Sequence, residues 1–443
     1  MPYNLLSAPA GPFTQGVQYL YDPNLVQNET TGMFRPVTVG DVSSVGLGDG
    51  ANLDAFSRLR VSDTTSLFDS SFKYDLRPLL FYTNTIAGAT ITHNYNRAAA
   101  VMTVDTGATS KAQIQSKLYI RYVPAKSQFI AMTQVIGAAV ANVVKRIGYF
   151  DDRDGIYLEQ NGITDTAFCI RTSTSGTPSD SNRVAQQNWN LDKLDGTGPS
   201  RIKLDLSRSQ ILIIDFQWLG MGRVRVGFDI DGQIIYCHEF LNANNLAVPY
   251  MQTSNLPVRW EIFNIGTSAG ATMYATCSSV QSEGGTEPDK GFYYSVSSPS
   301  EVSLDVNRKV VLAIRPTSGY NGRINRVQIQ PQAIEFLGGL NPLIVETWYN
   351  PTLAGGAWTV ANQYSAVEWG TGQTFSDLGT KIATVFVGTS NANQGADSSV
   401  FSSRRFPLSL DISGYNPISL AVTARSTNSN SSCWGEIEWS ELS

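Results

Sequence analysis

Apolar residues in this chain recur at every second position instead of at helical spacing. Several short runs, rich in β-branched or aromatic residues and bounded by Gly, Asn, Asp, Ser or Pro, show it: KLYIRYV (117–123), RVRVGFDI, VSLDV, VVLAIR, NRVQIQ and LSLDI. A period of two sends alternate side chains to opposite faces of a strand, whereas a helix needs apolar residues three and four apart. We therefore predict an all-β protein with an extended N-terminal arm, a central jelly-roll sandwich and a second, C-terminal β-sandwich domain.

Length and charge narrow the classes of function. The chain has 443 residues, 42% of them apolar, which is enough to give roughly two to three ordinary domains a core. Only 16% are charged, and the net charge of -5 comes without a basic block, whereas nucleic-acid binding needs clustered Lys and Arg. No window reaches the ~18 apolar residues of a membrane span, and the opening MPYNLLSAPAGPFTQG lacks a signal-peptide pattern. We expect no nucleic-acid partner and no membrane span.

Composition divides the chain into three parts. Residues 1–50 carry the Pro, Gly, Asn and Ser punctuation of a segment that packs on a neighbour, so we predict an extended arm for assembly, with a mobile tail as the alternative. Residues 51–287 form the predicted jelly roll. The stretch SVQSEGGTEPDKG (279–291) has the composition of a linker, and residues 288–443 form the predicted C-terminal β-domain.

A hairpin is predicted in DFQWLGMGRVRVGFDIDGQIIYCHEF (215–240). Asp231-Gly232 between two alternating runs favours a type I' turn, which needs positive φ at both positions and pairs Ile230 with Gln233. Counting outward gives the pairs Phe228–Ile235, Val226–Cys237 and Val224–Glu239 on the apolar face, and Gly227–Tyr236 and Arg225–His238 on the polar face. Cys237 and His238 then point to opposite sides of the sheet, which argues against a nucleophile pair.

Motifs that carry catalysis in other proteins fail here on their context. GTSAG (266–270) matches the G-x-S-x-G nucleophile elbow, but the following ATMYATC alternates as a strand, which predicts a hairpin loop where a hydrolase needs a helix. Asp151 and Asp152, like Asp229 and Asp231, fall in predicted hairpin turns, where carboxylates face water instead of one another. We predict no catalytic residue and expect a protein that is not an enzyme.

Metal and cofactor sites are likewise not expected. A second hairpin turns at Asp154-Gly155, and its acidic loop departs from the EF-hand pattern because Phe150 and Asn161 stand where the first Asp and the bidentate Glu belong. A solvated turn is the preferred interpretation. The four cysteines lie tens of residues apart without a CxxC pair, so buried free thiols are expected.

One stretch resembles a known family. NLDAFSRLRVSDTTSLFDSSFKYD (52–75) is similar to the DAFGRLRVS...LFDS signature of virion structural proteins from tailed bacteriophages, and four later blocks follow in the same order. Ser57 stands where the family commonly has Gly, which implies a less strained turn. The positions that the resemblance marks as structural are Asp54, Phe56, Arg58, Arg60, Trp218, Arg223, Arg225, Asp231 and Gly232.

The resemblance also implies a fold, a setting and partners. It implies a concanavalin-like or laminin-G-like jelly roll for residues 51–287. Packing is implied for Phe216 and Trp218. The carboxylates that could pair with Arg223 and Arg225 are Asp205, Asp215 and Glu261.

As a function, the resemblance implies a non-enzymatic structural component of a phage virion. Such a component is an exterior capsid decoration or head fibre, or a tail fibre or baseplate protein. Its partners would be other virion proteins and further copies of itself, with a trimer favoured among homo-oligomers. The alternative is a host receptor or glycan-binding module on the tail, which would bind a host surface glycan. A polysaccharide-degrading tailspike would need two or three carboxylates that converge in a groove.

The predicted C-terminal domain contains a dense group of aromatic residues. They fall in TWYNPTLAGGAWTVANQYSAVEW and are Trp348, Tyr349, Trp358, Tyr364 and Trp369. Aromatic rings at this density stack on sugar rings, anchor a protein interface or fill a sandwich core. A core or a subunit interface is the preferred interpretation, and a glycan contact is the alternative.

Overall fold

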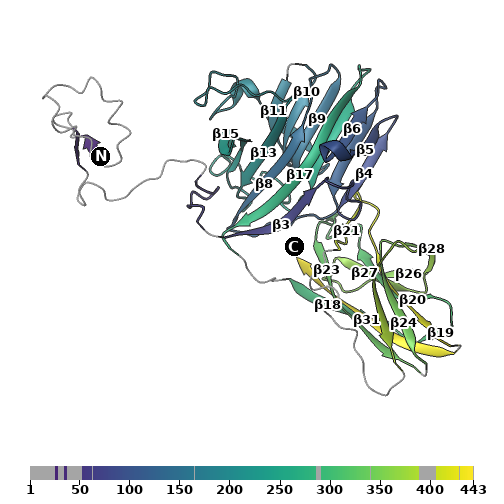
Figure 1. Cartoon of the computed structure of the whole chain (residues 1–443). Helices are drawn as coiled ribbons and strands as arrows, with labels where there is room; N and C mark the ends of the chain where they lie inside the picture. The colour runs from purple at the N-terminus through teal and green to yellow at the C-terminus, as the bar shows by residue number, and fades with distance from the viewer. Residues whose placement is uncertain are drawn as a thin grey trace. The chain divides into compact units, whose positions relative to one another are not determined.

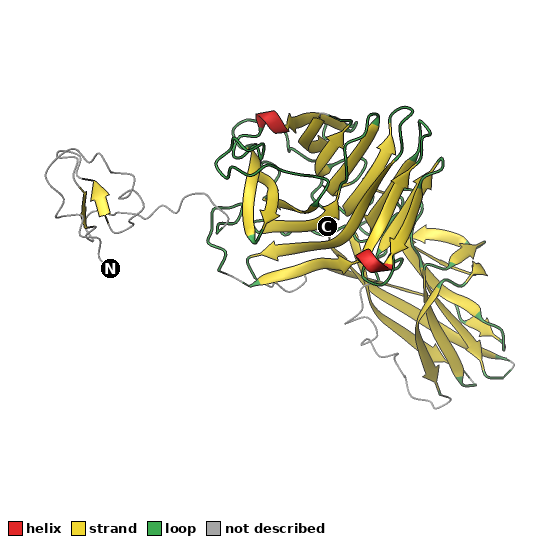
Figure 2. Cartoon of the chain, turned by 45° about the horizontal axis from the view of Figure 1, so that its top comes forward, coloured by secondary structure: helices red, strands yellow, loops and turns green. Residues whose placement is uncertain are grey.

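Strand alternation sorts the side chains of this protein into apolar interiors and polar exteriors. The computed structural model describes residues 25–27, 34–36 and 52–442, except 62, 164, 286–290, 340, 389–405 and 429. Within these residues strands dominate, and the helices are two short 3-10 helices, η3 (Tyr95–Arg97) and η4 (Gln186–Asn188), which are red in Figure 2. The all-β prediction is confirmed.

Two antiparallel sheets form a first sandwich, a jelly roll. One has the strand order β12 (Ser179–Ala185), β11 (Asp165–Thr172), β10 (Gly155–Asn161), β9 (Val143–Phe150), β16 (Val258–Asn264), β7 (Lys111–Ser116) and β4 (Phe81–Ile86). The other has the order β15 (Gln233–Phe240), β14 (Val224–Ile230), β13 (Ser209–Phe216), β8 (Ser127–Val135), β17 (Ala271–Glu283), β6 (Ala99–Val104) and β5 (Thr90–Asn94), with β3 (Thr64–Ser71) paired to β17. The two sheets lie face to face (Figure 1). Their facing sides share one apolar core that includes Trp260, Phe216 and Phe168.

A second sandwich follows in the chain. One sheet contains β18 (Phe292–Ser297), β31 (Ser431–Leu442), β19 (Val302–Leu304) and β23 (Gln328–Gly338). The other has the order β26 (Ala357–Val360), β27 (Val367–Thr371), β20 (Lys309–Pro316), β30 (Leu420–Ser426), β24 (Leu343–Tyr349) and β29 (Thr380–Val387). Two small hairpins pair β21 (Gly319–Tyr320) with β22 (Arg323–Ile324) and β25 (Thr352–Ala354) with β28 (Thr374–Asp377). Trp439 and Leu420 lie in the core that the two larger sheets share.

The structure tests only part of the predicted division of the chain into three segments. Residues 51–443 form one compact unit and residues 1–50 another. In the latter, β1 (Leu25–Gln27) pairs with β2 (Phe34–Pro36), and the rest of the predicted arm lies outside the described residues. Strand β17 continues to Glu283, so the first residues of the predicted linker belong to a strand. The boundary between residues 51–287 and 288–443 stays a prediction.

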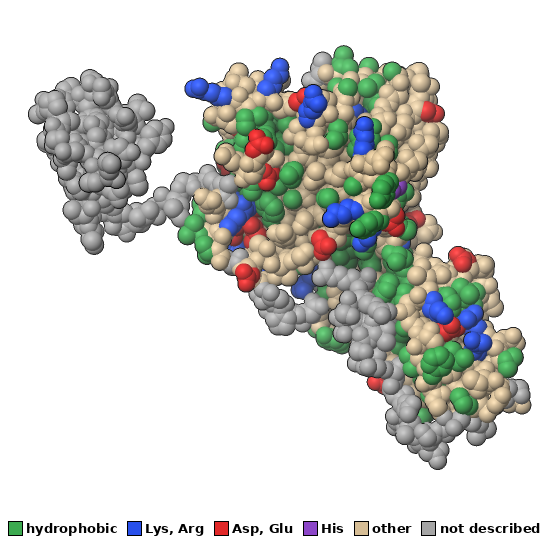
Figure 3. Space-filling view, viewed as in Figure 1, with side chains coloured by type: hydrophobic (Ala, Val, Ile, Leu, Met, Phe, Trp, Pro, Cys, Tyr) green, Lys and Arg blue, Asp and Glu red, His purple; other side chains and the backbone are tan. Residues whose placement is uncertain are grey.

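The surface is sparsely charged. On the face seen in Figure 3, the Lys, Arg, Asp and Glu side chains of the described residues stand singly or in small groups among polar and apolar ones. No helix in the described part of the chain is long and apolar enough to cross a membrane. On the face seen in Figure 3 the charged side chains are therefore dispersed.

The β14–β15 hairpin confirms the predicted turn but not its whole register. Asp231 and Gly232 have φ values of 53° and 81°, as a type I' turn requires, and the first pairs outward match the predicted ones. A β-bulge then shifts the register, so Val226 pairs with His238 and not with Cys237. The prediction assumed an unbroken ladder, and the extra residue of the bulge displaces every pair beyond it.

The cysteines differ in exposure. Cys169, Cys237 and Cys433 are buried, as expected, whereas Cys277 on β17 is exposed. Burial raises the pKa of the Cys169 and Cys433 thiols to about 12. The expectation of four buried thiols is therefore wrong at Cys277.

A buried carboxylate anchors the segment before β3 to the outward face of the β13–β14–β15 sheet. Asp215 on β13 is fully buried. Arg60 and Arg225 donate to its Oδ2 at 2.6 and 2.5 Å, the Tyr236 hydroxyl donates to the same atom at 2.7 Å, and Ser127 donates to Oδ1 at 2.8 Å. The predicted pairing of Arg225 with Asp215 is confirmed.

The segment before Arg60 is folded by its own polar groups. Asp54 Oδ1 accepts the backbone N–H groups of Phe56 and Arg58 at 2.9 Å each, and Arg58 Nε donates to Oδ2 at 2.8 Å. The Arg58 guanidinium also lies 4.8 Å from the centre of the Phe56 ring. Ser57 has a φ of 60°, in the left-handed region that favours glycine, so the expectation of a less strained turn is wrong.

Two arginines, one on β14 and one just before it, tie this segment to the sheet. Arg225 donates to the Leu53 carbonyl at 2.6 Å, and Arg223 donates to the Ala55 carbonyl at 3.2 Å. Trp218 packs against the core edge-on to Tyr122. Arg60, Arg223 and Arg225 therefore join the polypeptide before β3 to the eight-stranded sheet.

Removing the anchor carboxylate should destabilise the first sandwich strongly. An Asp215→Ala variant leaves the Arg225 guanidinium buried without its partner, which costs about 3 to 5 kcal/mol of unfolding free energy. Urea unfolding measures this loss. Asp229→Ala, a change on the neighbouring strand β14 outside the cluster, is the control. A loss below about 1 kcal/mol for Asp215→Ala, typical of a surface ion pair, would contradict the anchoring role.

Candidate functional site

The outward face of the seven-stranded sheet gathers charged side chains that are themselves largely buried. Alternation turns Ile114, Trp260 and Ile147 into the core, so their neighbours project from the opposite face. The outward side chains are Lys111, Gln113, Gln115, Arg146, Phe150, Tyr157, Glu159, Cys169, Arg171, Asp180, Arg183, Arg259, Glu261 and Phe263. A charged group that is buried away from water needs an ion-pair or hydrogen-bond partner, so the charged side chains of this face pair with one another.

Glu261 on β16 lies at the centre of this network, and its side chain is 2% exposed. Arg146 Nη1 lies 3.3 Å from Oε1, and Arg259 Nη1 and Lys111 Nζ lie 3.6 and 3.7 Å from Oε2. The Gln113 amide donates to Oε2 at 2.9 Å. Burial raises the pKa of Glu261, but the three cations outweigh it and hold the pKa at about 2. Glu261 is therefore ionised at neutral pH and accepts hydrogen bonds.

Two further carboxylates carry the network toward β12. Glu159 accepts from Arg146 Nε at 2.7 Å and from Arg183 Nε at 2.9 Å. Asp180 accepts from Arg171 Nε at 2.7 Å and from Arg171 Nη2 at 2.9 Å, which is the fork-like pairing that guanidinium groups favour. Burial raises the pKa of Asp180, but the hydrogen bond and charge of Arg171 hold it below its usual value.

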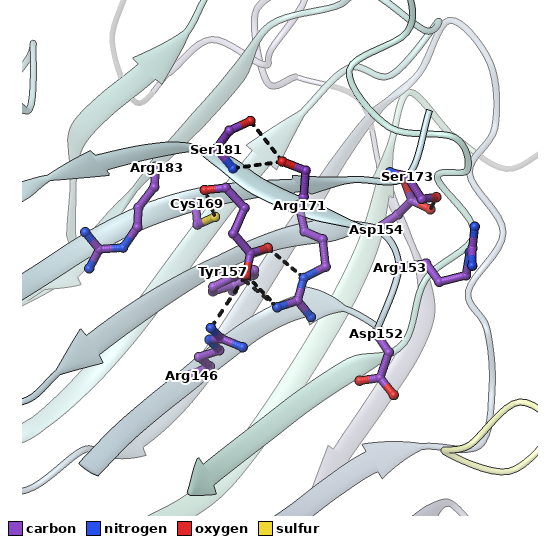
Figure 4. Close-up of polar contacts among 12 residues, drawn as sticks. Arg146, Asp152, Arg153, Asp154, Tyr157, Cys169, Arg171, Ser173, Ser181 and Arg183 are labelled. Atoms are coloured by element: carbon purple, nitrogen blue, oxygen red, sulfur yellow. Dashed lines mark hydrogen bonds and ion pairs between the residues drawn. The ribbon is translucent and has the colours of Figure 1, made fainter. Parts of the chain in front are cut away.

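Aromatic rings fill the spaces between the guanidinium groups. The ring centres of Phe150 and Tyr157 lie 4.7 Å apart. The Arg146 guanidinium lies 5.2 Å from the Tyr157 ring centre and 5.1 Å from that of Phe263, and the Arg171 guanidinium lies 5.3 Å from Tyr157. Figure 4 shows Arg146, Tyr157 and Arg171 pointing toward one another. Cation–π contact thus fixes the planar groups as a layered floor.

Gly148 on β9 makes this layering sterically feasible. A Cβ atom there would lie 2.3 Å from the Ile156 carbonyl oxygen and 2.8 Å from the Tyr157 Cβ atom. Tyr157 on the neighbouring strand therefore occupies the space that any other residue at position 148 would need. The glycine lets the Tyr157 side chain lie close to β9, within reach of Arg146.

The loop between β9 and β10 closes one end of this face. Asp151 and Asp154 are each only 1% exposed, and Asp154 accepts from the backbone and the hydroxyl of Ser173 at 3.0 and 2.6 Å. Asp152 is 57% exposed and lies 2.5 Å from Arg259 Nη1. The prediction of a solvated acidic turn is therefore wrong, because two of its carboxylates are buried and hydrogen-bonded.

A pocket of about 320 Å³ opens over this floor. It is lined by Lys111, Arg146, Asp152, Arg171, Pro178, Asp180, Glu261 and Phe263. The volume lies at the small end of the range of ~300–1,000 Å³ for small-molecule sites. The pocket presents N–H donors, ionised carboxylate acceptors and an aromatic ring, all held by contacts within the protein.

The aromatic residues predicted as interface or glycan contacts lie on the second sandwich and do not form one platform. Tyr349 is 1% exposed in the core, and Trp369 packs against that core. Trp348 and Trp358 lie beneath the guanidinium groups of neighbouring arginines, at 5.0 and 3.9 Å. Tyr364 is 67% exposed. A role for these five residues in assembly or glycan contact stays a prediction.

The pocket residues were not predicted as a site. From the sequence, Glu261 is expected only as a partner for Arg223 or Arg225, and Asp152 only as part of a turn. A weak signal existed in KRIGYF, IYLEQN and RWEIF, where charged residues alternate with apolar ones. Alternation shows that such residues share a face of their own strand, but it does not show which strands are neighbours.

No family model matches this chain, and no curated protein matches it. Several solved structures resemble its fold at low sequence identity. A glycoside hydrolase family 16 protein from Mycobacterium smegmatis is 12% identical, covers 49% of this chain and 100% of its own, and has a TM-score of 0.34. A carbohydrate esterase from the Shiga toxin-encoding bacteriophage phi24B is 12% identical, with coverages of 50% and 100% and a TM-score of 0.31. The Emp47p carbohydrate recognition domain is 11% identical, with coverages of 49% and 96% and a TM-score of 0.30.

These comparisons correct one expectation from the sequence. The statement that the protein is not an enzyme is contradicted, because glycoside hydrolases and a carbohydrate esterase are among the structures that resemble it. At these identities the likeness is one of fold alone.

Protonation of Glu261 should weaken the fold in acid. The folded-state pKa is lowered from 4.5 to about 2, so this group's stabilisation is complete above about pH 4.5 and is lost as the pH falls toward 2. A pKa shift of this size corresponds to about 3 kcal/mol of unfolding free energy. The urea midpoint of wild type should therefore exceed that of Glu261→Gln at pH 6, and the difference should shrink as the pH falls to 2.

The matched control is Glu335→Gln, which removes an exposed carboxylate of the second sandwich. Its unfolding midpoints should follow those of the unaltered protein at every pH. A constant difference between wild type and Glu261→Gln from pH 6 to pH 2 would show that Glu261 does not titrate in this way.

Proposed function

We propose that this protein binds a neutral oligosaccharide in the pocket over the outward face of β7, β16, β9, β10, β11 and β12. The observation that carries the proposal is the floor itself, where paired guanidinium and carboxylate groups alternate with aromatic rings beneath an open pocket. Each part of that arrangement matches one part of a sugar.

Sugar hydroxyl groups both donate and accept hydrogen bonds, so a sugar site needs both kinds of partner close together. Arg171 and Asp180 provide such a pair at the pocket edge, and the partly exposed Lys111 adds a further donor. The ring of Phe263, also in the pocket lining, offers an apolar surface to the C–H groups of a sugar. Charge-assisted bonds of this kind are stronger than neutral ones and fix the ligand's orientation.

Charge balance favours a neutral ligand. The pocket lining contains three cations, Lys111, Arg146 and Arg171, and three carboxylates, Asp152, Asp180 and Glu261, so the formal sum is zero. A sulfated or uronic-acid sugar would place a further negative charge beside carboxylates that are already ionised. A neutral sugar avoids that repulsion.

The pocket edge offers the groups that a ligand can reach. Side-chain exposure is 33% for Asp180 and 29% for Lys111, against 2% for Glu261. Partly exposed groups can exchange water for ligand without breaking the floor, whereas the buried carboxylate holds the floor in shape. The contacts are thus arranged before binding, which lowers the ordering cost of association.

Asp180→Ala should weaken binding while the sandwich stays folded. A panel of neutral hexasaccharides of glucose, galactose and mannose, with sulfated and uronic-acid counterparts, should show binding of a neutral member by calorimetry. Loss of a hydrogen bond to a charged group should raise its Kd about tenfold or more, equivalent to about 1.5 kcal/mol. Asp205→Ala, an exposed carboxylate of the same sandwich outside the pocket, is the control. Equal affinity of Asp180→Ala and wild type, or binding of acidic sugars alone, contradicts the proposal.

The resemblance to tailed-phage virion proteins provides a setting for this activity. We propose that the protein is a virion component that assembles with other virion proteins and with further copies of itself, as a trimer, and that its ligand is a host surface glycan. The support is the sequence signature of residues 52–75, whose Asp54, Arg58 and Arg60 hold the segment before β3 on the sheet. The virion assignment stands independently of the pocket chemistry.

Immunogold electron microscopy of intact particles tests the virion proposal. An antibody against residues 292–442 should label the particle surface. Label at the tail would match a role in adsorption, and label over the head would make the protein a decoration or head fibre. Particles that carry no label, beside purified protein that the antibody recognises, would remove the virion assignment and leave glycan binding to be judged separately.

A further inference from the structure

The loop between β9 and β10 contacts the pocket floor on one side and the second sandwich on the other. Asp152 reaches the floor through Arg259, and the preceding Asp151 reaches Arg326, which lies between β22 and β23 of the second sandwich. Figure 4 shows Asp152, Arg153 and Asp154 of this loop beside the floor residues. Adjacent residues of one short loop thus bind two different parts of the chain.

We infer that Arg326 is a positioning residue through which the second sandwich fixes the wall and edge of the oligosaccharide pocket. This inference rests on the proposed function for its consequence in binding, but its structural content concerns the β9–β10 loop alone. Arg326 lines no part of the pocket, and it acts through Asp151 and through Tyr119.

The first connection runs through the Asp151 carboxylate. Arg326 Nε and Nη2 each lie 2.8 Å from Oδ2, and the backbone N–H groups of Arg153 and Asp154 donate to Oδ1 at 2.7 and 3.0 Å. Oδ2 therefore binds Arg326 of the second sandwich, while Oδ1 binds the backbone of the loop. Asp151 is 2% exposed in its side chain, so loss of Arg326 would remove the main counter-charge of a buried carboxylate.

The loop backbone passes this constraint to the edge of the pocket. Arg171 Nη1 donates to the Asp151 carbonyl oxygen at 3.0 Å, while Nε and Nη2 of the same guanidinium hold Asp180. A shift of Asp151 therefore moves the guanidinium that orients Asp180. Asp180, the group that we assign to the ligand, is thus three contacts away from Arg326, through Asp151 and Arg171.

The second connection runs through Tyr119 to the floor. The Arg326 guanidinium lies 4.3 Å from the Tyr119 ring centre, and the Tyr119 hydroxyl accepts from the Gln115 amide at 3.1 Å. The Gln115 carbonyl oxygen in turn accepts from Arg259 Nε at 2.8 Å. Both connections therefore meet at the pocket, because Arg259 also pairs with Asp152 of the loop. Two independent chains of contact leave little freedom for that loop while Arg326 is in place.

The test compares Arg326→Ala with Arg326→Lys and with Arg323→Ala in the full-length protein. Arg323 is the matched control, because it is an exposed arginine on β22 that, like Arg326, lines a separate recess beside Asp151 and Asp154. Hydrogen exchange of the loop amides at Arg153 and Asp154 gives a readout that needs no ligand. We expect Arg326→Ala to speed this exchange at least tenfold, Arg326→Lys to restore part of the protection, and Arg323→Ala to leave it unchanged.

Binding of the tightest neutral hexasaccharide from the panel gives the second readout. Arg326→Ala should raise its Kd by about tenfold with an unchanged near-UV circular dichroism spectrum, while Arg323→Ala keeps the wild-type Kd. If the wild-type protein binds the hexasaccharide, and Arg326→Ala has the same Kd and the same loop exchange as wild type, the inference is overturned and the proposed function still stands. If wild type binds no hexasaccharide, the proposed function fails, and the loop exchange alone decides whether Arg326 positions the wall.

Discussion

A carboxylate that leaves water must be surrounded by donors, and both outward faces of the first sandwich are organised by that constraint. On the eight-stranded sheet the carboxylate is Asp215, and on the seven-stranded sheet it is Glu261. Each draws arginines from other strands or from a distant segment, as Arg60 shows on the first face and Arg146 on the second. Because an unpaired buried charge is costly, these contacts fix where neighbouring strands and segments lie.

The same constraint supplies the chemistry of the pocket. A floor built from satisfied ion pairs keeps its donors and acceptors in place before any ligand arrives, so little order has to be imposed on binding. Glu261 gives the floor its geometry, and the partly exposed Asp180 and Lys111 give it contacts. Stability and recognition therefore share one set of residues but use different members of it.

Local patterns predicted much of the fold and little of the site. The Asp231-Gly232 turn was readable because two adjacent residues dictate its backbone, whereas the bulge that displaces Cys237 has no such local signature. Residues 117–123 alternate like a strand, and their Tyr and Ile side chains are buried. The segment is nevertheless not a strand, because its pairing is a single bridge between Ile120 and Leu256. Glu261 and its cations meet only after β7, β9 and β16 pair, and the order of strands in a sheet is not encoded locally.

Because one of the four thiols is exposed and three are buried, the molecule has a single cysteine that reagents in solution can reach. A thiol reacts as its thiolate, and Cys169, Cys237 and Cys433 are buried with raised pKa values, so they are poor nucleophiles. Cys277 is exposed on β17, beside Ser71 of β3. A maleimide dye or spin label should therefore attach at one defined point of the eight-stranded sheet without any engineered cysteine.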